Sequence, residues 1–196
     1  LEFKKMGLLE KTVFIITSDH GTEFYEHRRL DHGFSLYDEQ LRVPLIIKLP
    51  GQRSGKPISE RISSISLMPT ILDLLDIPRD DSLERQLRGT SLTTTLQGQP
   101  VSRAVFSETN YRAYTYKRSI ITPEGWKLIV TLENNERELY QLDQDPAEAS
   151  NRVQQEPARA EELHRQLFDH FKSLGHDLTA VRWRTGLNPV YESQGR

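Results

Sequence analysis

Cysteine is absent from the 196 residues, although histidine occurs six times. The sequence therefore offers no disulfide, no thiolate metal ligand and no cysteine nucleophile. This absence suits an exported protein and a cytoplasmic protein equally, so it does not indicate a compartment. Three of the histidines, His20, His27 and His32, lie close together in the sequence, and this cluster is the first candidate for chemistry.

The sequence also lacks a strong net charge and a long apolar run. Its formal net charge is −2, which gives no general attraction to nucleic acid or to an anionic membrane. No apolar run approaches the ~18 residues that a membrane-spanning helix requires. The first residues, "LEFKKMGLLEK", contain no apolar core of a signal peptide. We therefore expect no nucleic-acid partner and no membrane span.

The first hundred residues alternate between apolar runs of strand type and helix type. "KTVFIIT" (residues 11–17) is short and apolar, which predicts a strand buried on both faces, and "VPLIIKLPG" (residues 43–51) predicts a second buried strand. We expect one or both of these strands to belong to a parallel sheet. "SLMPTILDLLDIP" (residues 66–78) predicts a helix from its apolar spacing. The pattern is typical of an α/β domain, placed at residues 1–100. Because the chain begins at leucine so close to a mid-sheet strand, we expect a piece of a longer protein.

Beyond residue 100 the pattern changes to short strands. Four strand-like runs, separated by turn residues, predict a small antiparallel sheet: "RAVFSET", "KRSIIT", "GWKLIVTL" and "RELYQL". A helix follows, with Pro157 in its first turn and Gly175 just past its end. We therefore expect an antiparallel β subdomain with a C-terminal helix at residues 101–180 and a polar tail at residues 181–196.

The stretch "TSDHG" places two metal-binding side chains directly after the first predicted strand. In open α/β sheets ligands bind beyond the carboxyl ends of the strands, and Gly21 permits a turn that brings Asp19 and His20 toward one point. A carboxylate with an imidazole suits zinc, manganese or iron, whereas calcium accepts the carboxylate more readily than the imidazole. Two ligands do not complete a site. The alternative is that this pair only closes a turn.

Longer stretches of the sequence carry a specific resemblance. "LLEKTVFIITSDHGTEFYEHRRLDHGFSLYDEQLRVPLIIKLPG" resembles the second half of a sulfatase, in the alkaline-phosphatase-like superfamily. "SLMPTILDLLDIP", "LRGTSLTTTLQG" and "ELYQLDQDPAEASNR" resemble later motifs of that family in the same order. The resemblance covers most of residues 5–175. It implies part of an alkaline-phosphatase-like sheet-and-helix domain, followed by the small antiparallel sheet packed with the C-terminal helix.

The resemblance assigns roles to individual residues. Asp19 matches the aspartate that ligates the family's single divalent metal, and His20 the next ligand position, where many members carry asparagine. His32 matches the histidine or lysine that contacts the sulfate or assists the leaving group. His27 is a candidate for substrate binding, with an exposed loop histidine as the alternative. The implied cofactor is one divalent metal, with calcium first and manganese or zinc as alternatives.

Other family features do not occur in these residues. The family's Asp-Asp metal pair and its Cys-x-Pro-x-Arg motif, whose cysteine becomes formylglycine, lie in an earlier segment. The resemblance therefore implies a fragment of a metal-dependent sulfatase that hydrolyses sulfate esters. Its partners would be the N-terminal half of the enzyme and a sulfated small molecule or carbohydrate, and alone it would be inactive. Family analogy favours a periplasmic or secreted protein.

Two further functions stay open. The first is a phosphomonoester or phosphonate hydrolase, or a phosphoryl-headgroup transferase, of the same superfamily. The second is a non-catalytic protein that binds an anionic glycan through "YRAYTYKR" (residues 111–118), although a two-faced surface strand explains the same alternation. In "GWKLI" we expect Trp126 to be structural and Lys127 to extend to solvent.

Overall fold

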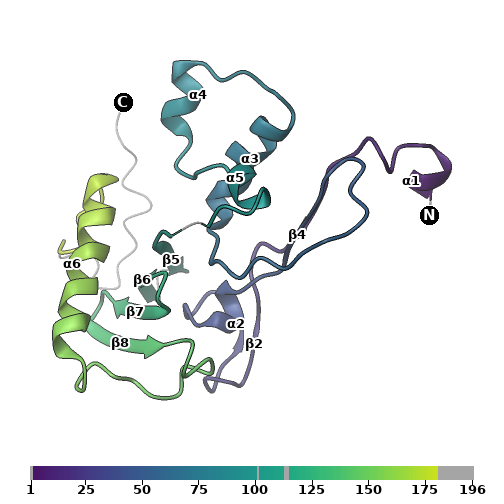
Figure 1. Cartoon of the computed structure of the whole chain (residues 1–196). Coiled ribbons are helices and arrows are strands. Elements are labelled where there is room, and N and C mark those ends of the chain that lie inside the picture. The colour runs from purple at the N-terminus through teal and green to yellow at the C-terminus, as the bar shows by residue number, and fades with distance from the viewer. Residues whose placement is uncertain (1, 101, 113–114, 181–196) are drawn as a thin grey trace.

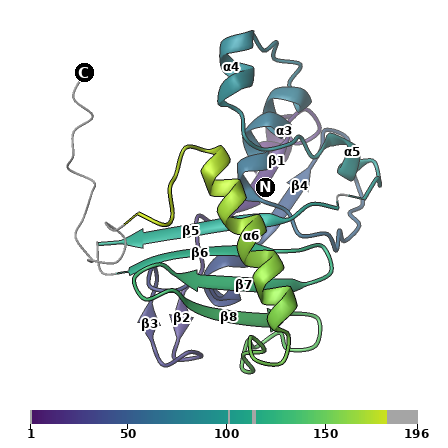
Figure 2. The same ribbon diagram turned by 90° about the vertical axis from the view of Figure 1, so that its left-hand side faces the viewer.

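The computed structural model describes residues 2–100, 102–112 and 115–180 (Figure 1). The predicted polar tail, residues 181–196, lies outside these residues. A four-stranded sheet lies between a long C-terminal helix on one face and the segment with the histidine motifs on the other (Figure 2). Among the described residues, no helix combines the length and the apolar character needed to cross a bilayer.

The central sheet is antiparallel, as the sequence predicts. Its strand order is β5-β6-β7-β8, so each strand pairs with the one that follows it along the chain. The strands are β5 (Val105–Tyr111), β6 (Thr115–Ile121), β7 (Trp126–Thr131) and β8 (Glu136–Gln141). Both faces of β6 are covered, because six of its seven residues are buried. The antiparallel sheet and its closing helix are therefore confirmed.

The helix α6 (Pro157–Ser173) crosses one face of this sheet (Figure 2). Proline lies in the first turn, where its missing N–H costs no helical hydrogen bond. The buried residues of α6 recur at helical spacing and pack on alternate residues of the strands: Ala160, Leu163, Leu167 and Phe171 against Tyr116, Ile120, Leu128, Val130 and Leu139. This is the larger apolar core of the chain's described part.

The opposite face of the sheet packs against residues near the short helix α2 (Asp38–Leu41). Leu36 is 2% exposed and contacts buried side chains of β6 and β7, Ile121 and Ile129. Tyr37 and Leu41 pack around this second core. The segment that carries the histidines is therefore held against a rigid sheet.

The first predicted strand pair differs from expectation. β1 (Phe14–Thr17) and β4 (Leu45–Lys48) form a two-stranded sheet that is antiparallel, with Ile16 opposite Ile46. These two side chains are 58% and 57% exposed, so neither strand is buried on both faces. An apolar run indicates that a strand can be covered, but it does not encode the direction of the neighbouring strand. The predictions of a parallel partner and of two-sided burial are wrong for this pair.

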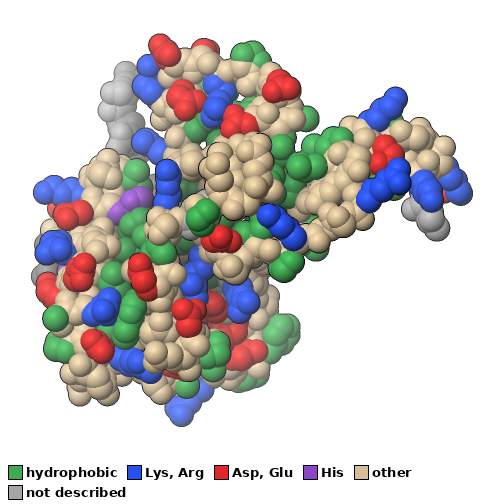
Figure 3. All heavy atoms as spheres, viewed as in Figure 1, with side chains coloured by type: hydrophobic (Ala, Val, Ile, Leu, Met, Phe, Trp, Pro, Cys, Tyr) green, Lys and Arg blue, Asp and Glu red, His purple; other side chains and the backbone are tan. Residues whose placement is uncertain are grey.

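The remaining elements are short. β2 (Glu23–Phe24) and β3 (Leu30–Asp31) form a small hairpin. The helical elements are α1 (Glu2–Lys5), the 3₁₀ turn Ser64–Ser66, α3 (Leu67–Leu74), α4 (Asp81–Gln86) and α5 (Thr93–Leu96). The helix predicted over residues 66–78 is confirmed as α3. The segment with α1 and the β1–β4 pair projects from the body as an arm (Figures 1 and 3).

Candidate metal and leaving-group site

The two Asp-His-Gly motifs meet in space. Asp19 and His20 follow the end of β1, and His32 follows β3. The imidazole rings of His20 and His32 are stacked, with centroids 4.0 Å apart and an angle of 20° between their planes. The resemblance matches His20 to a metal ligand and His32 to a leaving-group residue, and these two side chains lie in direct contact.

Asp19 presents its carboxylate to solvent, since its side chain is 86% exposed. The backbone N–H of His20 donates to Asp19 Oδ1 at 3.0 Å, and Ser18 Oγ donates to the same oxygen at 3.3 Å. The backbone hydrogen bond is the largest cause that lowers the pKa of Asp19 below its ordinary value. The carboxylate is consequently an anion at neutral pH, as a metal ligand must be.

His20 turns one ring nitrogen toward the backbone and the other toward Asp19. Its Nδ1 lies 2.8 Å from the carbonyl oxygen of Gly21, which can only accept, so Nδ1 carries the proton of the neutral ring. Its Nε2 lies 3.6 Å from Asp19 Oδ2. The lone pair of Nε2 and the carboxylate oxygens are thus close enough to serve one cation, and a backbone carbonyl fixes the tautomer as in known metal sites.

These two residues fit a divalent metal but do not complete its shell. The described residues contain no group of three or more His, Cys, Asp or Glu side chains arranged to hold a metal ion. Structural zinc takes four ligands, and calcium takes six to eight oxygens. Two ligands are fewer than either metal requires, and a metal role for Asp19 and His20 stays a prediction.

His32 is held by its neighbour. Its Nδ1 lies 2.8 Å from Asp31 Oδ1, so the carboxylate accepts the Nδ1 proton and leaves Nε2 for a substrate or solvent. Asp31 has φ 98°, which is uncommon outside glycine and typically costs ~1–3 kcal/mol. The pairing of Asp31 with Glu23 in the β2–β3 hairpin stabilises this conformation.

Comparison with known proteins identifies the family. A family model described as Sulfatase matches residues 2–77, which include both Asp-His-Gly motifs. The chain is 31% identical over 165 residues to arylsulfatase K from Bos taurus. It is 30% identical over 176 residues to Delta 4,5-hexuronate-2-O-sulfatase from Bacteroides thetaiotaomicron. This chain belongs to the sulfatase family.

The similarity covers most of this chain but a minor part of each relative. The two alignments include 77% and 85% of this chain but 29% and 36% of the relatives, so the chain spans about a third of their length. A solved structure of a 2-O GAG sulfatase superposes with a TM-score of 0.71 at 30% identity, over 89% of this chain and 40% of that one. The predicted sulfatase-like fold is thereby confirmed.

His27 lies apart from the stacked pair, within the interface to the central sheet. Its ring stacks on Tyr37 with centroids 3.6 Å apart, and its Nδ1 lies 3.3 Å from Glu39 Oε1. The side chain is 15% exposed, so the interpretation as an exposed loop histidine is wrong. The contacts seen here position the loop against α2, and a role in substrate binding stays a prediction.

Lys127 contradicts the expectation that it extends to solvent. Its side chain is fully buried between β7 and α2, where Nζ lies 3.0 Å from Asp38 Oδ1 and 2.9 Å from Glu148 Oε1. Burial raises the pKa of Glu148, and the attraction of Lys127 opposes that rise. In this sulfatase chain the ion pair therefore joins the histidine-bearing segment to the sheet. The signal in the sequence was a lysine inside the apolar run of β7.

The stretch at residues 138–152, which carries the last of the family-like motifs, also has a structural explanation. Glu148 Oε2 accepts the N–H of Asp38 at 2.6 Å, at the first residue of α2. Asn151 Oδ1 accepts the N–H of Leu139 at 3.0 Å, and Asp145 accepts the N–H of Ser150 at 2.9 Å. These bonds fold the chain back over β8 and support α2. The sequence resemblance locates this motif, but only the structure reveals its connection to α2.

In the aromatic and basic stretch at residues 111–118, the part on β6 lies inside the protein, whereas residues 113–114 lie outside the described residues. Tyr116 and Arg118 are 1% and 0% exposed, and the Arg118 guanidinium lies 3.0 Å from Glu108. Lys117 Nζ donates to Thr131 Oγ1 at 2.7 Å. Tyr116, Lys117 and Arg118 are therefore not free to stack on a sugar, and the interpretation as a two-faced surface strand is wrong for the part on β6. Arg112 is exposed, and glycan binding through this stretch stays a prediction.

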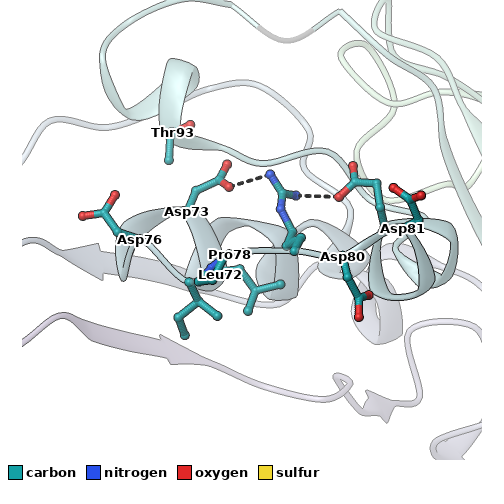
Figure 4. A pocket seen from close by; sticks show the side chains of 10 residues that line it. Leu72, Asp73, Asp76, Pro78, Asp80, Asp81 and Thr93 are labelled. Atoms are coloured by element: carbon teal, nitrogen blue, oxygen red, sulfur yellow. Dashed lines mark hydrogen bonds and ion pairs between the residues drawn. The ribbon is translucent and has the colours of Figure 1, made fainter.

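The hollow beside α3 and α4 is a separate feature, and Figure 4 shows its lining. Arg79 lies within it and pairs with Asp73 at 2.8 Å and with Glu84 at 3.4 Å. Three more aspartates, Asp76, Asp80 and Asp81, also line the hollow. An acidic lining repels a sulfate ester, so this hollow is not the substrate site of a sulfatase.

Proposed function

We propose that this chain supplies part of the active site of a sulfuric ester hydrolase. The observation that carries the proposal is the meeting of Asp19, His20 and His32 from two separate motifs. The family match over residues 2–77 supports it, because that segment contains all three residues.

Each residue has a distinct role in the proposed reaction. Asp19 and His20 hold one divalent cation, with calcium first and manganese or zinc as alternatives. When bound, the cation polarises the ester oxygens and lowers the pKa of the nucleophile. His32, in its doubly protonated form, keeps its Nδ1 proton bonded to Asp31 and gives its Nε2 proton to the leaving alkoxide oxygen, which departs as the alcohol.

The nucleophile would come from outside these residues. The 196 residues contain no cysteine, so they contain no Cys-x-Pro-x-Arg motif whose cysteine could become formylglycine. The relatives are about three times as long as the segment they share with this chain, which leaves room for such a motif. We therefore propose that the 196 residues alone do not turn over a sulfate ester.

The proposed substrate is a sulfated carbohydrate. One relative is named as a hexuronate-2-O-sulfatase, and one superposable structure is a 2-O GAG sulfatase. Both are about 30% identical to this chain. These two names support an acidic, sulfated sugar as the first compound to test.

The first experiment is to sequence the DNA upstream of the Leu1 codon. An open frame that continues into an Asp-Asp pair and Cys-x-Pro-x-Arg supports the sulfatase proposal. A stop codon immediately upstream, with initiation at or near Met6, contradicts the hydrolase proposal.

The second experiment uses the protein encoded by the extended frame. Asp19→Asn should abolish turnover of 4-nitrophenyl sulfate and lower the bound metal content, whereas Asp169→Asn, an exposed aspartate of α6, should change neither. His32→Ala should slow a sugar sulfate far more than 4-nitrophenyl sulfate, because nitrophenolate leaves without a proton. Equal losses on both substrates would contradict the leaving-group role.

A second candidate function is hydrolysis of a phosphate ester. The observation that favours it is the imidazole of His20 beside Asp19, because imidazole shifts metal preference from calcium toward manganese or zinc. Metal analysis of the extended protein, together with turnover of 4-nitrophenyl phosphate against the sulfate, separates the two. Calcium with sulfate turnover contradicts this candidate.

A further inference from the structure

One residue of α2 holds both Asp-His-Gly turns. The backbone carbonyl of Gln40 accepts the N–H of Gly21 at 2.8 Å, and the side-chain Oε1 of Gln40 accepts the N–H of Gly33 at 2.7 Å. Gly21 directly follows His20, and Gly33 directly follows His32. The two histidines are thus connected through a single residue that is only 5% exposed.

The amide of Gln40 is oriented by a buried network. Its Nε2 donates to Glu23 Oε1 at 3.0 Å and to Ser35 Oγ at 2.8 Å, and the Ser35 hydroxyl donates to Glu23. Glu23 and Ser35 are 0% and 5% exposed. Because a carboxylate can only accept, the NH₂ group must face Glu23, and Oε1 must face Gly33.

The turns themselves have little room to move. A Cβ at Gly21 would lie 1.9 Å from the carbonyl oxygen of Glu39, so the backbone approaches α2 as closely as glycine permits. Gly33 has φ +92°, and its carbonyl accepts the hydroxyl of Thr109 at 2.7 Å. The hydrogen bonds of Gln40 therefore act on turns that are already confined.

We propose that Gln40 is a positioning residue that sets the contact between His20 and His32. Its main chain holds the turn at Gly21, which follows His20, and its side chain holds the turn at Gly33, which follows His32. The functional meaning of this contact rests on the proposed function, in which the cation at Asp19 and His20 and the proton donor His32 act on the same sulfate ester. The contact itself depends only on the fold.

The test is the nuclear Overhauser effect (NOE) between the ring protons of His20 and His32 in the histidine-labelled chain. Gln40→Glu replaces the NH₂ donor with a second carboxylate facing Glu23, and the cross-peak is expected to be lost. The double variant Glu23→Gln with Gln40→Glu exchanges donor and acceptor within the same network. It is expected to restore the cross-peak, because the carboxylate introduced at position 40 would still accept the N–H of Gly33.

Two further variants separate positioning from general stability. Thr70→Val removes a buried hydroxyl that bonds Ser66 and Leu92, far from both motifs in the sequence, and should keep the cross-peak. Thr109→Val removes one bond to Gly33 and should weaken the cross-peak even if Gln40→Glu does not fold. A folded Gln40→Glu chain with the full cross-peak overturns the proposal, and so does a folded double variant without it.

Addition of Mn²⁺ distinguishes this proposal from the proposed function. If Asp19 and His20 bind the ion, paramagnetic broadening should reach the rings of both His20 and His32. It should disappear in Asp19→Asn, while the NOE between the rings persists. Broadening that is unchanged by Asp19→Asn contradicts the proposed metal site but leaves the role of Gln40 intact.

Discussion

Replacement of Lys127 by methionine tests the buried ion pair that joins the histidine-bearing segment to the sheet. Lys127 is fully buried, and Glu148 is 1% exposed in its side chain. Methionine keeps most of the aliphatic stem but leaves the carboxylates of Glu148 and Asp38 without a cation. Removal of one partner from a buried pair typically costs ~3–5 kcal/mol, because the other charge stays buried and unpaired.

The assay is urea unfolding at neutral pH, followed by tryptophan fluorescence. Lys127→Met should lower the free energy of unfolding by ~3–5 kcal/mol. The double variant Lys127→Met with Glu148→Gln should recover more than half of that loss. In it the amide oxygen introduced at position 148 can still accept the N–H of Asp38, and no unpaired glutamate charge stays buried.

Lys5→Met is the matched control. Lys5 Nζ lies 2.8 Å from Glu2 Oε1, a distance close to that of the buried pair, but the side chains are 72% and 75% exposed. Exposed ion pairs contribute ~0–1 kcal/mol to stability, so the free energy of unfolding of this variant should be close to that of the parent chain. If Lys127→Met and Lys5→Met lower the free energy of unfolding by the same small amount, burial does not determine the contribution of the Lys127–Glu148 pair, and the reasoning is wrong.

Two other predictions concern stability. Gly33→Ala should lower the free energy of unfolding by ~1–3 kcal/mol, because φ is +92° and a Cβ would meet the ring of Tyr111; urea unfolding without a loss would contradict this. His170 stacks on Phe106, and burial lowers its pKa below the ordinary 6.5. As pH falls through that value the unfolded chain takes up the proton first, so stability should decline as the pH is lowered from neutral. His170→Phe should reduce this decline, and an unchanged pH slope in urea unfolding would contradict it.

Local patterns were sufficient for the elements that depend on local spacing. The apolar stripe of α6 and the short strands separated by turn residues predicted the antiparallel sheet and its helix, because each pattern repeats within a few residues. The motif "TSDHG" likewise identified Asp19 and His20 as candidates, since their chemistry is visible in the residue types alone. His32 came from the resemblance to sulfatases.

Predictions that depend on contacts between residues far apart in the sequence were less successful. The apolar runs of β1 and β4 did not reveal that they pair antiparallel with one face exposed, because periodicity contains no information about a neighbour's direction. Lys127 was expected at the surface, yet its partner Asp38 lies 89 residues earlier in the sequence. A contact over that separation exists only once α2 packs on the sheet.

The sequence by itself determined the family, the order of the elements and the residue types available for metal binding and proton transfer. Only the tertiary structure decided that His20 and His32 stack, that Gln40 bonds both turns, and that Lys127 is buried. The physical reason is that residue type sets which bonds a group can make, whereas burial and distance set which bonds it does make. Burial and distance are properties of the packed chain.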